Sequence, residues 1–145
     1  MSYEPTDVEL RQLLDRYVAQ WNEQDPELRA ELIRQVWAVD GVQVLVNPPE
    51  EIRQTAAHHG IAHPPLEVHG HDAFDARVRR AYELFVAPGR YVFELGDTPV
   101  RQAGSAVTFT WVMRDRTDGS VAGSGFDVLT FDEDARIRTD HQFVA

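Results

Sequence analysis

Two residue types are missing from this chain of 145 residues: it has no cysteine, and all 14 of its basic residues are arginine, so lysine is absent as well. Without cysteine, the chain has no thiol nucleophile, no disulfide and no thiolate metal ligand. Without lysine, it cannot form a Schiff base or supply the phosphate-binding lysine of a P-loop. Carboxylate, histidine, tyrosine, arginine and serine chemistry remains.

Positive charge and long apolar runs are also scarce. The 24 acidic residues outnumber the 14 basic ones, and the formal net charge is -10. Nucleic-acid backbones and anionic membrane surfaces would therefore be repelled. No run approaches the ~18 apolar residues of a membrane span, and residues 1–20 lack a signal-peptide pattern. We expect a soluble, cytoplasmic protein with no nucleic-acid or membrane partner, folded as one domain over residues 1–145.

Helical periodicity dominates the first part of the chain. Thr6 and Glu9 form a capping box, and Tyr17 lies on the apolar stripe of the helix that follows. Gly41 is expected to close the second helix. The pattern predicts three long helices over 7–22, 26–38 and 72–86, with a short strand over 42–46 and a short helix over 50–59 between the last two.

The period changes to two in the second part of the chain. Candidate strands cover 90–95, 105–114, 121–132 and 136–144, and Asp118 with Gly119 marks a hairpin turn. Gly123 and Gly125 are expected to mark a bulge or bend. Helices followed by strands indicate an α+β fold, with an antiparallel sheet curled around N-terminal helices.

Asp127 stands in the apolar run GSGFDVLTF and needs a physical reason. Alternation places it on the same strand face as Leu129 and Phe131, which predicts that it points inward. A buried carboxylate costs several kcal/mol unless it is paired or protonated. Burial should raise its pKa, so Asp127 could serve as an acid or hydrogen-bond donor. The structural alternatives are that it accepts hydrogen bonds from backbone amides at the following hairpin, or that its strand face lies at a polar dimer interface.

The order of elements, together with RYVAQW in the first helix and GFDVLTFDEDARIRTDHQF at the end, resembles the nuclear transport factor 2 superfamily. Within it, the chain looks most like SnoaL-like polyketide cyclases and ketosteroid isomerases. The resemblance covers nearly the whole chain. It implies a cone-shaped α+β fold whose helices and curled sheet enclose a hydrophobic pocket, and it leaves the activity open, because many members catalyse no reaction.

The same resemblance implies site residues. Tyr17 matches the oxyanion-hole tyrosine of the isomerases, and Asp127 matches the protonated acid beside it. In ketosteroid isomerases these two groups donate hydrogen bonds to the developing enolate. The isomerases' general base has no counterpart, because VLVNPPEE offers Asn47 and no acid before Glu50. The strand over 105–113 lacks the Arg and Asp of the epoxide-hydrolase members. Polyketide cyclases carry an acid/base carboxylate in the last strand, where Asp140 is the nearest candidate.

The last strand has two faces that periodicity cannot rank. One carries Asp140 and Gln142, and the other carries His141. The resemblance turns Asp140 and Gln142 toward the pocket, which makes Asp140 the base. If the other face is inside, His141 takes that place, because its ordinary pKa suits general base catalysis.

Aromatic side chains are candidates for the pocket walls. Phe109 and Trp111 share a strand face, and Trp37 could join them around a ring-containing ligand, with Asn47 as a further ligand-binding candidate. Packing in the core is the alternative for such an apolar stripe.

Five of the six histidines lie between residues 58 and 71. Their spacing does not favour a metal site, because His59 and His63 would straddle the helix-ending Gly60. We expect no metal, and instead a segment over 47–70 that acts as a lid over the pocket.

These observations lead to one functional hypothesis and one alternative. The hypothesis is a cofactor-independent isomerase or cyclase that moves a proton next to the carbonyl group of a small hydrophobic molecule, with Asp127 as acid, Tyr17 as its neighbour and Asp140 or His141 as base. The alternative is a non-catalytic ligand-binding or dimerisation module of the same fold. In either case, the outer sheet face is expected to form a homodimer.

Overall fold

The computed structural model describes residues 3–47 and 66–145. The predicted helices and strands within these residues occur in the expected order, and three further short elements, β2, β4 and η2, accompany them. The elements are α1 (Asp7–Asn22), α2 (Pro26–Val36), β1 (Trp37–Leu45), β2 (Leu66–His69), α4 (Gly70–Ala81), the π-helix η1 (Tyr82–Val86), β3 (Tyr91–Leu95), β4 (Val100–Arg101), the 3-10 turn η2 (Ala103–Ser105), β5 (Val107–Asp115), β6 (Val121–Phe131) and β7 (Ile137–Val144).

The N-terminal helix begins where its capping box predicts. The Thr6 hydroxyl oxygen accepts a hydrogen bond from the Glu9 N–H at 3.2 Å, and the Glu9 carboxylate accepts one from the Thr6 N–H at 2.8 Å. These contacts satisfy two of the N–H groups that a helix start leaves without partners. The predicted helix over 7–22 is confirmed, and Tyr17 is buried on its inner face.

The expected end of the second helix is wrong. Helix α2 ends at Val36, and β1 starts at Trp37 without an intervening turn, so Gly41 lies inside the strand. The pairing of β1 with β7 shifts register between Trp37 and Val42. A Cβ on Gly41 would lie 2.9 Å from the carbonyl oxygen of Ala38, so this irregular stretch requires glycine for close backbone approach.

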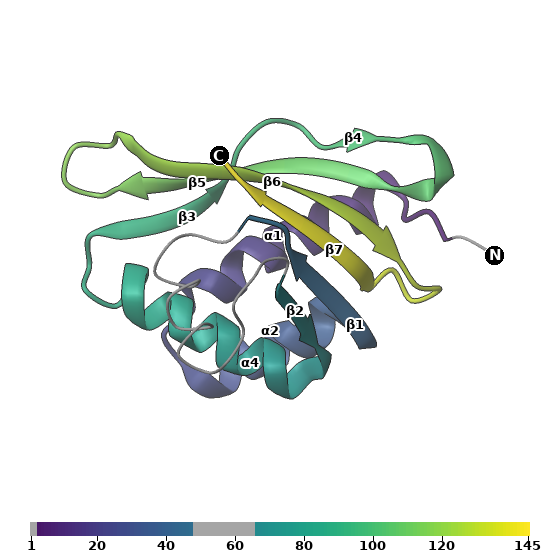
Figure 1. The fold of residues 1–145 in the computed structure, drawn as a ribbon, viewed down its shortest axis with the longest axis horizontal. Helices are drawn as coiled ribbons and strands as arrows, with labels where there is room; N and C mark the ends of the chain where they lie inside the picture. Colours follow the sequence, from purple (N-terminus) through teal and green to yellow (C-terminus); the bar gives the residue numbers. More distant parts are fainter. Residues whose placement is uncertain (1–2, 48–65) are drawn as a thin grey trace.

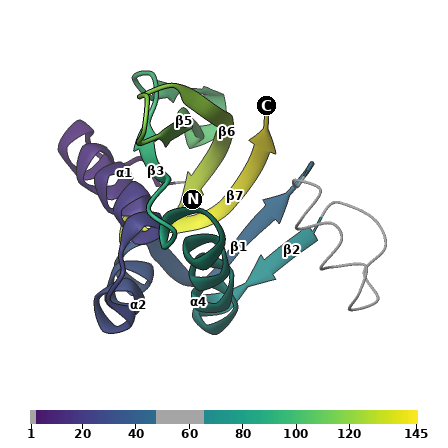
Figure 2. The same cartoon turned by 90° about the vertical axis from the view of Figure 1, so that its left-hand side faces the viewer.

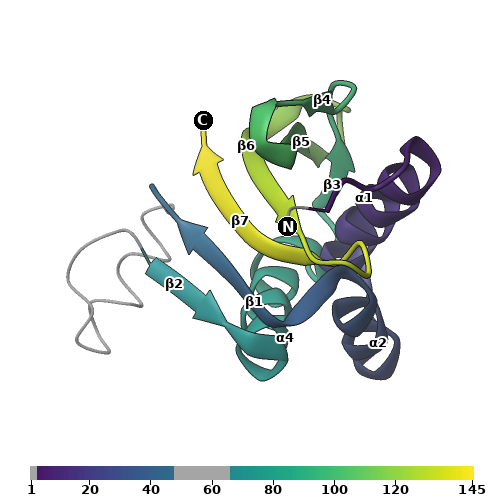
Figure 3. The ribbon, with the colours of Figure 1, turned by 90° about the vertical axis from the view of Figure 1, so that its right-hand side faces the viewer.

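The strands form one open, curled sheet in the order β2-β1-β7-β6-β5-β3, with β4 paired to β5. Figure 1 shows α1, α2 and α4 on one side of the long strands, and Figures 2 and 3 show the sheet bending around these helices. The α+β class and the curled sheet are confirmed. The sheet is not purely antiparallel, because β1 and β7 pair in parallel. Their residues lie far apart in the sequence, where no turn signal fixes the direction of pairing.

The third long helix changes its winding near its end. Helix α4 continues into the π-helix η1, and together they cover the predicted range 72–86. Extra residues in a π-turn alter which side chains face inward, and such turns are frequent at functional sites. Here the change occurs where Ala81 and Phe85 face the hollow interior of the sheet.

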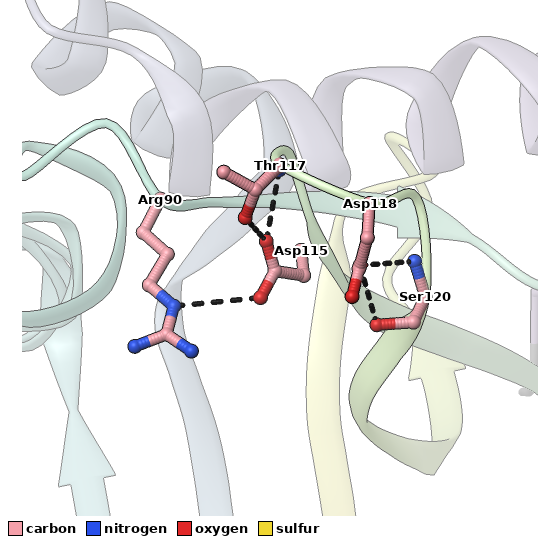
Figure 4. Close-up of polar contacts among 5 residues, drawn as sticks. All are labelled: Arg90, Asp115, Thr117, Asp118 and Ser120. Atoms are coloured by element: carbon pink, nitrogen blue, oxygen red, sulfur yellow. Dashed lines mark hydrogen bonds and ion pairs between the residues drawn. The ribbon is translucent and has the colours of Figure 1, made fainter.

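The β5–β6 hairpin closes through the turn that Asp118 and Gly119 predict (Figure 4). Asp115 accepts a hydrogen bond from the Thr117 N–H, and Asp118 accepts one from the Ser120 N–H, each at 2.9 Å. Gly119 has a φ of 76°, which glycine adopts at little cost. The turn fixes the register that carries Asp127 inward.

The core lies between the helices and the concave side of the sheet. Its largest fully buried apolar side chains come from all three long helices and from the central strands: Trp37, Tyr17, Phe74, Leu14, Ile33, Leu129 and Ile137. Within residues 3–47 and 66–145, no helix has both the length and the apolar character to cross a membrane.

Candidate functional site

A cavity of about 290 Å³ opens between α1, α4, η1 and the strands β3, β5, β6 and β7. Five aromatic residues from α1, η1, β3 and β5 supply much of its wall: Tyr17, Trp21, Phe85, Phe93 and Trp111. Three polar side chains also line it, namely Arg77, Ser124 and Gln142. A mostly apolar hollow with a few converging polar groups is the usual form of a small-molecule site.

Two carboxyl groups lie directly behind this wall. Asp127 on β6 pairs with Gln142 on β7, and Asp140 pairs with Leu129, so the two acids are diagonal neighbours on one face of the sheet. Each has an exposed fraction of 0%. The structure therefore has the inward orientation that alternation predicts for Asp127 and that the resemblance, not alternation, implies for Asp140.

Tyr17 joins the two acids. Its hydroxyl lies 2.9 Å from Asp127 Oδ2 and 3.1 Å from Asp140 Oδ2. The phenol has one proton to donate and lines the cavity itself. Tyr17 thus connects the cavity with the acid pair.

Asp127 has a donor at each oxygen. The indole N–H of Trp111 donates to Oδ1 at 2.9 Å, while Tyr17 and, at 3.4 Å, the Gln142 amide donate to Oδ2. These partners are side chains, so the alternative of backbone-amide partners is not what the described residues show. A carboxyl that only accepts hydrogen bonds is suited to carry negative charge.

The partners of Asp140 differ between its two oxygens. Oδ2 accepts from the Gln43 amide at 3.0 Å and from Tyr17, whereas buried Oδ1 has no donor among the described residues. A proton on Oδ1 removes the cost of leaving that oxygen charged and unsatisfied. It would also let Asp140 donate a hydrogen bond toward Asp127.

The pKa directions agree with this assignment. Burial, followed by the negative charge of Asp127 and the hydrogen bond with it, raises the pKa of Asp140 well above its ordinary value. Burial also raises the pKa of Asp127, but hydrogen bonds from Asp140, Tyr17 and Trp111 oppose that rise. Two neighbouring carboxyls in a low-dielectric site cannot both ionise readily, so the pair holds one proton, and Asp140 is its preferred position.

Tyr17 remains a phenol under these conditions. Burial is the main reason that its pKa lies well above 10, and the charges of Asp127 and Asp140 add to the rise. It can therefore donate a hydrogen bond, but it does not ionise near neutral pH.

Arg77 organises the amides around the acids. Its Nε donates to Gln43 Oε1 at 2.7 Å, and its Nη2 donates to Gln142 Oε1 at 2.9 Å. Because Arg77 binds both amide oxygens, both amide NH₂ groups must face the acids. The positive charge of Arg77 is thus linked to the negative charge of the acid pair through the neutral side chains of Gln43 and Gln142.

Comparison with solved structures identifies the fold. The chain is similar to a candidate isomerase of the SnoaL-like family from Agrobacterium tumefaciens, with 25% identity, coverage of 95% of this chain and 98% of that chain, and a TM-score of 0.71. It is also similar to an NTF2-like protein of unknown function from Exiguobacterium (19% identity, 92% and 98% coverage, TM-score 0.62). A third similar structure is a candidate SnoaL-like polyketide cyclase from Jannaschia (12% identity, 99% and 90% coverage, TM-score 0.65). No protein-family model and no curated protein matches the chain.

The chain has the SnoaL-like, nuclear transport factor 2-like fold. This agrees with the resemblance found in RYVAQW and in the C-terminal segment. Proteins with this fold differ widely in activity, so the fold by itself does not assign a reaction.

The SnoaL-like fold brings five predicted site residues together. The Tyr17 hydroxyl is hydrogen-bonded to both Asp127 and Asp140. Trp111 and Gln142 donate hydrogen bonds to Asp127 and also line the cavity. Phe109 packs behind them, with its ring edge-on to Tyr17 at 5.0 Å between centroids.

Three other predicted site residues lie elsewhere. His141 is exposed on the opposite face of β7, because alternation turns it away from Asp140. Trp37 belongs to the closed core, where its ring stacks on Phe74 at 3.9 Å. Asn47 is exposed, and its side chain makes two hydrogen bonds with the backbone of Val144 at 2.7 and 2.8 Å.

Arg77 and Gln43 are site residues that the sequence reasoning missed. Arg77 is on the face of α4 that also carries buried Phe74 and Val78, so its position in an apolar stripe was an available signal. Gln43 is fully buried within the run VQVLV, which presents the same problem of a polar residue in an apolar strand as Asp127.

The predictions on the histidine-rich segment remain partly untested. His58, His59 and His63, the short helix over 50–59 and most of the expected lid over 47–70 lie outside the described residues. Within the two described ranges, no group of three or more His, Asp or Glu side chains is placed to hold a metal ion.

Proposed function

We propose that this protein is a cofactor-independent acid/base enzyme of isomerase or cyclase type, which moves a proton next to the carbonyl group of a small hydrophobic compound. The observation that carries the proposal is the position of Tyr17, whose hydroxyl contacts both buried acids while the residue lines an aromatic cavity. Donors aimed at an oxygen that gains negative charge stabilise the transition state, and they act most strongly where water is excluded.

The proposal assigns the carbonyl oxygen of the substrate to Tyr17. As that oxygen gains negative charge, the phenol donates its hydrogen bond to it. The Asp140 carboxyl then rotates to turn its protonated oxygen toward Tyr17 and donates to the phenol oxygen. Asp140 is therefore the proton source, which reverses the roles expected from the sequence.

Asp127 is the base in this proposal, because its donors favour the charged form. It does not line the cavity directly. Trp111, Tyr17 and Gln142 stand in front of it, so a substrate carbon reaches Asp127 only after one of these side chains rotates.

The experiment is incorporation of solvent deuterium at the carbon beside the carbonyl in a panel of cyclic ketones, followed by NMR. We expect exchange with the wild-type protein, and losses of about 100-fold or more in Tyr17→Phe and Asp127→Asn, in line with general acid–base contributions. The control is His141→Asn, since His141 is exposed on the other strand face. Equal exchange in all four proteins would remove the acid pair from the mechanism.

A second candidate is a non-catalytic ligand-binding protein. It is favoured by the fact that Asp127 already has protein donors at both oxygens and is not part of the cavity wall. Saturable binding of ketones by calorimetry, with no deuterium exchange above buffer, would support this candidate over the enzyme.

We also propose a homodimer through the outer face of the sheet. Phe126 has an exposed fraction of 42% and stacks on Phe143 at 4.7 Å, with the rings 8° from parallel. Aromatic residues are enriched in the centres of protein–protein interfaces. Light scattering should show a dimer that Phe126→Glu dissociates, whereas Val121→Glu, at an exposed position elsewhere on β6, leaves it intact. The small hydrophobic ligand and the cytoplasmic location stay predictions.

A further inference from the structure

We propose that the cavity selects a small ring compound that carries a carboxylate, and that the guanidinium of Arg77 recognises this carboxylate. The proposal concerns binding in the same cavity as the proposed function and names the substrate class, but it depends on no catalytic step.

The charge of the cavity wall is the first argument. Among the described residues that line the cavity, Arg77 is the one ionisable side chain with a formal charge at neutral pH, and no Asp or Glu side chain belongs to the wall. The two buried acids stand behind Tyr17, Trp111 and Gln142. The charged side chain that the described wall offers a ligand is therefore cationic, although the protein as a whole has a formal charge of -10.

The position of the guanidinium is the second argument. Hydrogen bonds at 2.7 Å to Gln43 and 2.9 Å to Gln142 fix its orientation, and its Cζ lies 5.1 Å from the centre of the Trp21 ring. These bonds use Nε and Nη2. Nη1 makes no hydrogen bond within the described residues, so a planar guanidinium that is already held in place retains donors for a carboxylate.

Desolvation is the third argument. Arg77 is half-buried, and removal of water from its head group is the main reason that the pKa of Arg77 falls below its ordinary value. No carboxylate hydrogen-bonds to it within the described residues, because two neutral amides separate it from the acids. An incoming carboxylate would supply the direct charge-assisted hydrogen bond that the more distant acid pair does not make, in a low-dielectric site where the attraction is strongest.

The shape of the cavity explains the ring. Four aromatic rings form part of the wall, with Phe93 in contact with the other three. The centre of the Phe93 ring lies 6.3 Å from those of Trp21 and Phe85 and 6.0 Å from that of Trp111. A volume of about 290 Å³ suits a compound of one or two rings. Aromatic walls with one cation thus fit an aromatic or alicyclic carboxylate.

The test compares naphthalene-2-carboxylate with naphthalene-2-carboxamide, which have nearly the same shape and differ in charge. Affinities for the wild-type protein are measured by calorimetry at pH 7.5, and quenching of tryptophan fluorescence gives a second readout. We expect the carboxylate to bind at least about tenfold more tightly, as one charge-assisted hydrogen bond allows.

Variants of α4 then locate the recognition. Arg77→Gln should remove the preference, Arg77→Lys should keep part of it because the charge remains, and Arg80→Gln should keep all of it because Arg80 is exposed on the same helix. Thermal unfolding shows which variants are folded. The wild-type comparison alone can overturn the proposal if Arg77→Gln does not fold.

Three results would overturn the proposal: equal affinity for the two compounds, binding of neither, or an undiminished carboxylate preference in folded Arg77→Gln. Failure of the proposed function has a different signature. Selective carboxylate binding without deuterium exchange would remove the enzymatic reaction and leave the substrate class in place.

Discussion

The Tyr17 hydroxyl lies 2.9 Å from Asp127 Oδ2 and 3.1 Å from Asp140 Oδ2, so one phenol spans two buried carboxyl groups from adjacent strands. A single phenolic proton cannot satisfy both carboxylates fully. The low-dielectric surroundings also disfavour two negative charges at this spacing. We therefore infer that Asp127 and Asp140 together hold one proton beside the cavity.

The two acids should respond differently to amide substitution. In Asp140→Asn, the new NH₂ can take the place of the protonated Oδ1, while the amide oxygen accepts from Gln43 and Tyr17. We expect a stability change of less than about 1 kcal/mol. In Asp127→Asn, the NH₂ must face Trp111 or Tyr17, which are donors themselves, and we expect a loss of about 1–3 kcal/mol.

Urea unfolding at pH 7 measures both free energies. Each substitution removes one carboxyl and adds one amide, so the two variants are matched controls for each other. Equal losses of stability would show that the proton is not held preferentially on Asp140.

The raised pKa of Asp140 predicts a pH dependence of stability with a definite sign. Below about pH 4, the folded and unfolded chains both hold this proton. As the pH rises, the unfolded chain releases it first, so the free energy of unfolding falls until the raised folded pKa is passed. The contribution of Asp140 is therefore complete below about pH 4 and lost with rising pH.

Unfolding curves of wild type and Asp140→Asn between pH 4 and 8 report the titration of the acid pair, because groups that do not interact with Asp140 cancel in the difference. The variant should gain stability relative to wild type as the pH rises. A difference that stays constant, or that changes in the opposite direction, would mean that Asp140 ionises with an ordinary or lowered pKa.

Removal of the Tyr17 hydroxyl should cost stability as well as activity. In Tyr17→Phe, Asp127 Oδ2 keeps the 3.4 Å contact with Gln142, and Asp140 Oδ2 keeps Gln43. A loss of about 1–3 kcal/mol is expected for a buried acceptor that loses a donor. Tyr91→Phe is the control, since the Tyr91 hydroxyl has no hydrogen bond within the described residues. Thermal unfolding that gives the same small change for both variants would argue against the network.

Gly125 should tolerate no side chain. Its missing Cβ would meet the Phe143 carbonyl oxygen and lie 2.5 Å from Trp111 Cζ2, so the bare backbone lets the indole cross the strand and reach Asp127. We expect Gly125→Ala to destabilise the protein by about 1–3 kcal/mol and to shift tryptophan fluorescence. Gly123→Ala, whose Cβ would lie 3.6 Å from Met113, should change stability by less than about 0.5 kcal/mol. Similar behaviour of the two variants would contradict this packing.

Local chemistry predicted much of the fold and half of the site. The capping box at Thr6 and Glu9 fixed the start of α1, and alternation in β6 turned Asp127 inward. Both signals lie within a few residues of the feature that they predict. In β7 the apolar residues favoured the face that carries His141, and only the resemblance favoured Asp140, which the structure buries.

Contacts between distant segments were beyond the sequence signals. The parallel pairing of β1 with β7 brings Gln43 beside Asp140, and no local pattern specifies that pairing. Arg77 reaches Gln43 across 34 residues and Gln142 across 65. Trp37 was assigned to the pocket from its residue type, and Asn47 from its place near the position of the isomerases' base. The tertiary packing places Trp37 in the core and Asn47 against the Val144 backbone.

The most direct test of the shared proton is carbon-13 NMR of protein labelled at the aspartate side-chain carboxyl carbon. At pH 7, we predict one protonated aspartate signal in the wild-type protein, which disappears in Asp140→Asn. A spectrum at pH 7 in which every aspartate is ionised, or a protonated signal that persists unchanged in Asp140→Asn, would contradict the claim that Asp140 holds the shared proton.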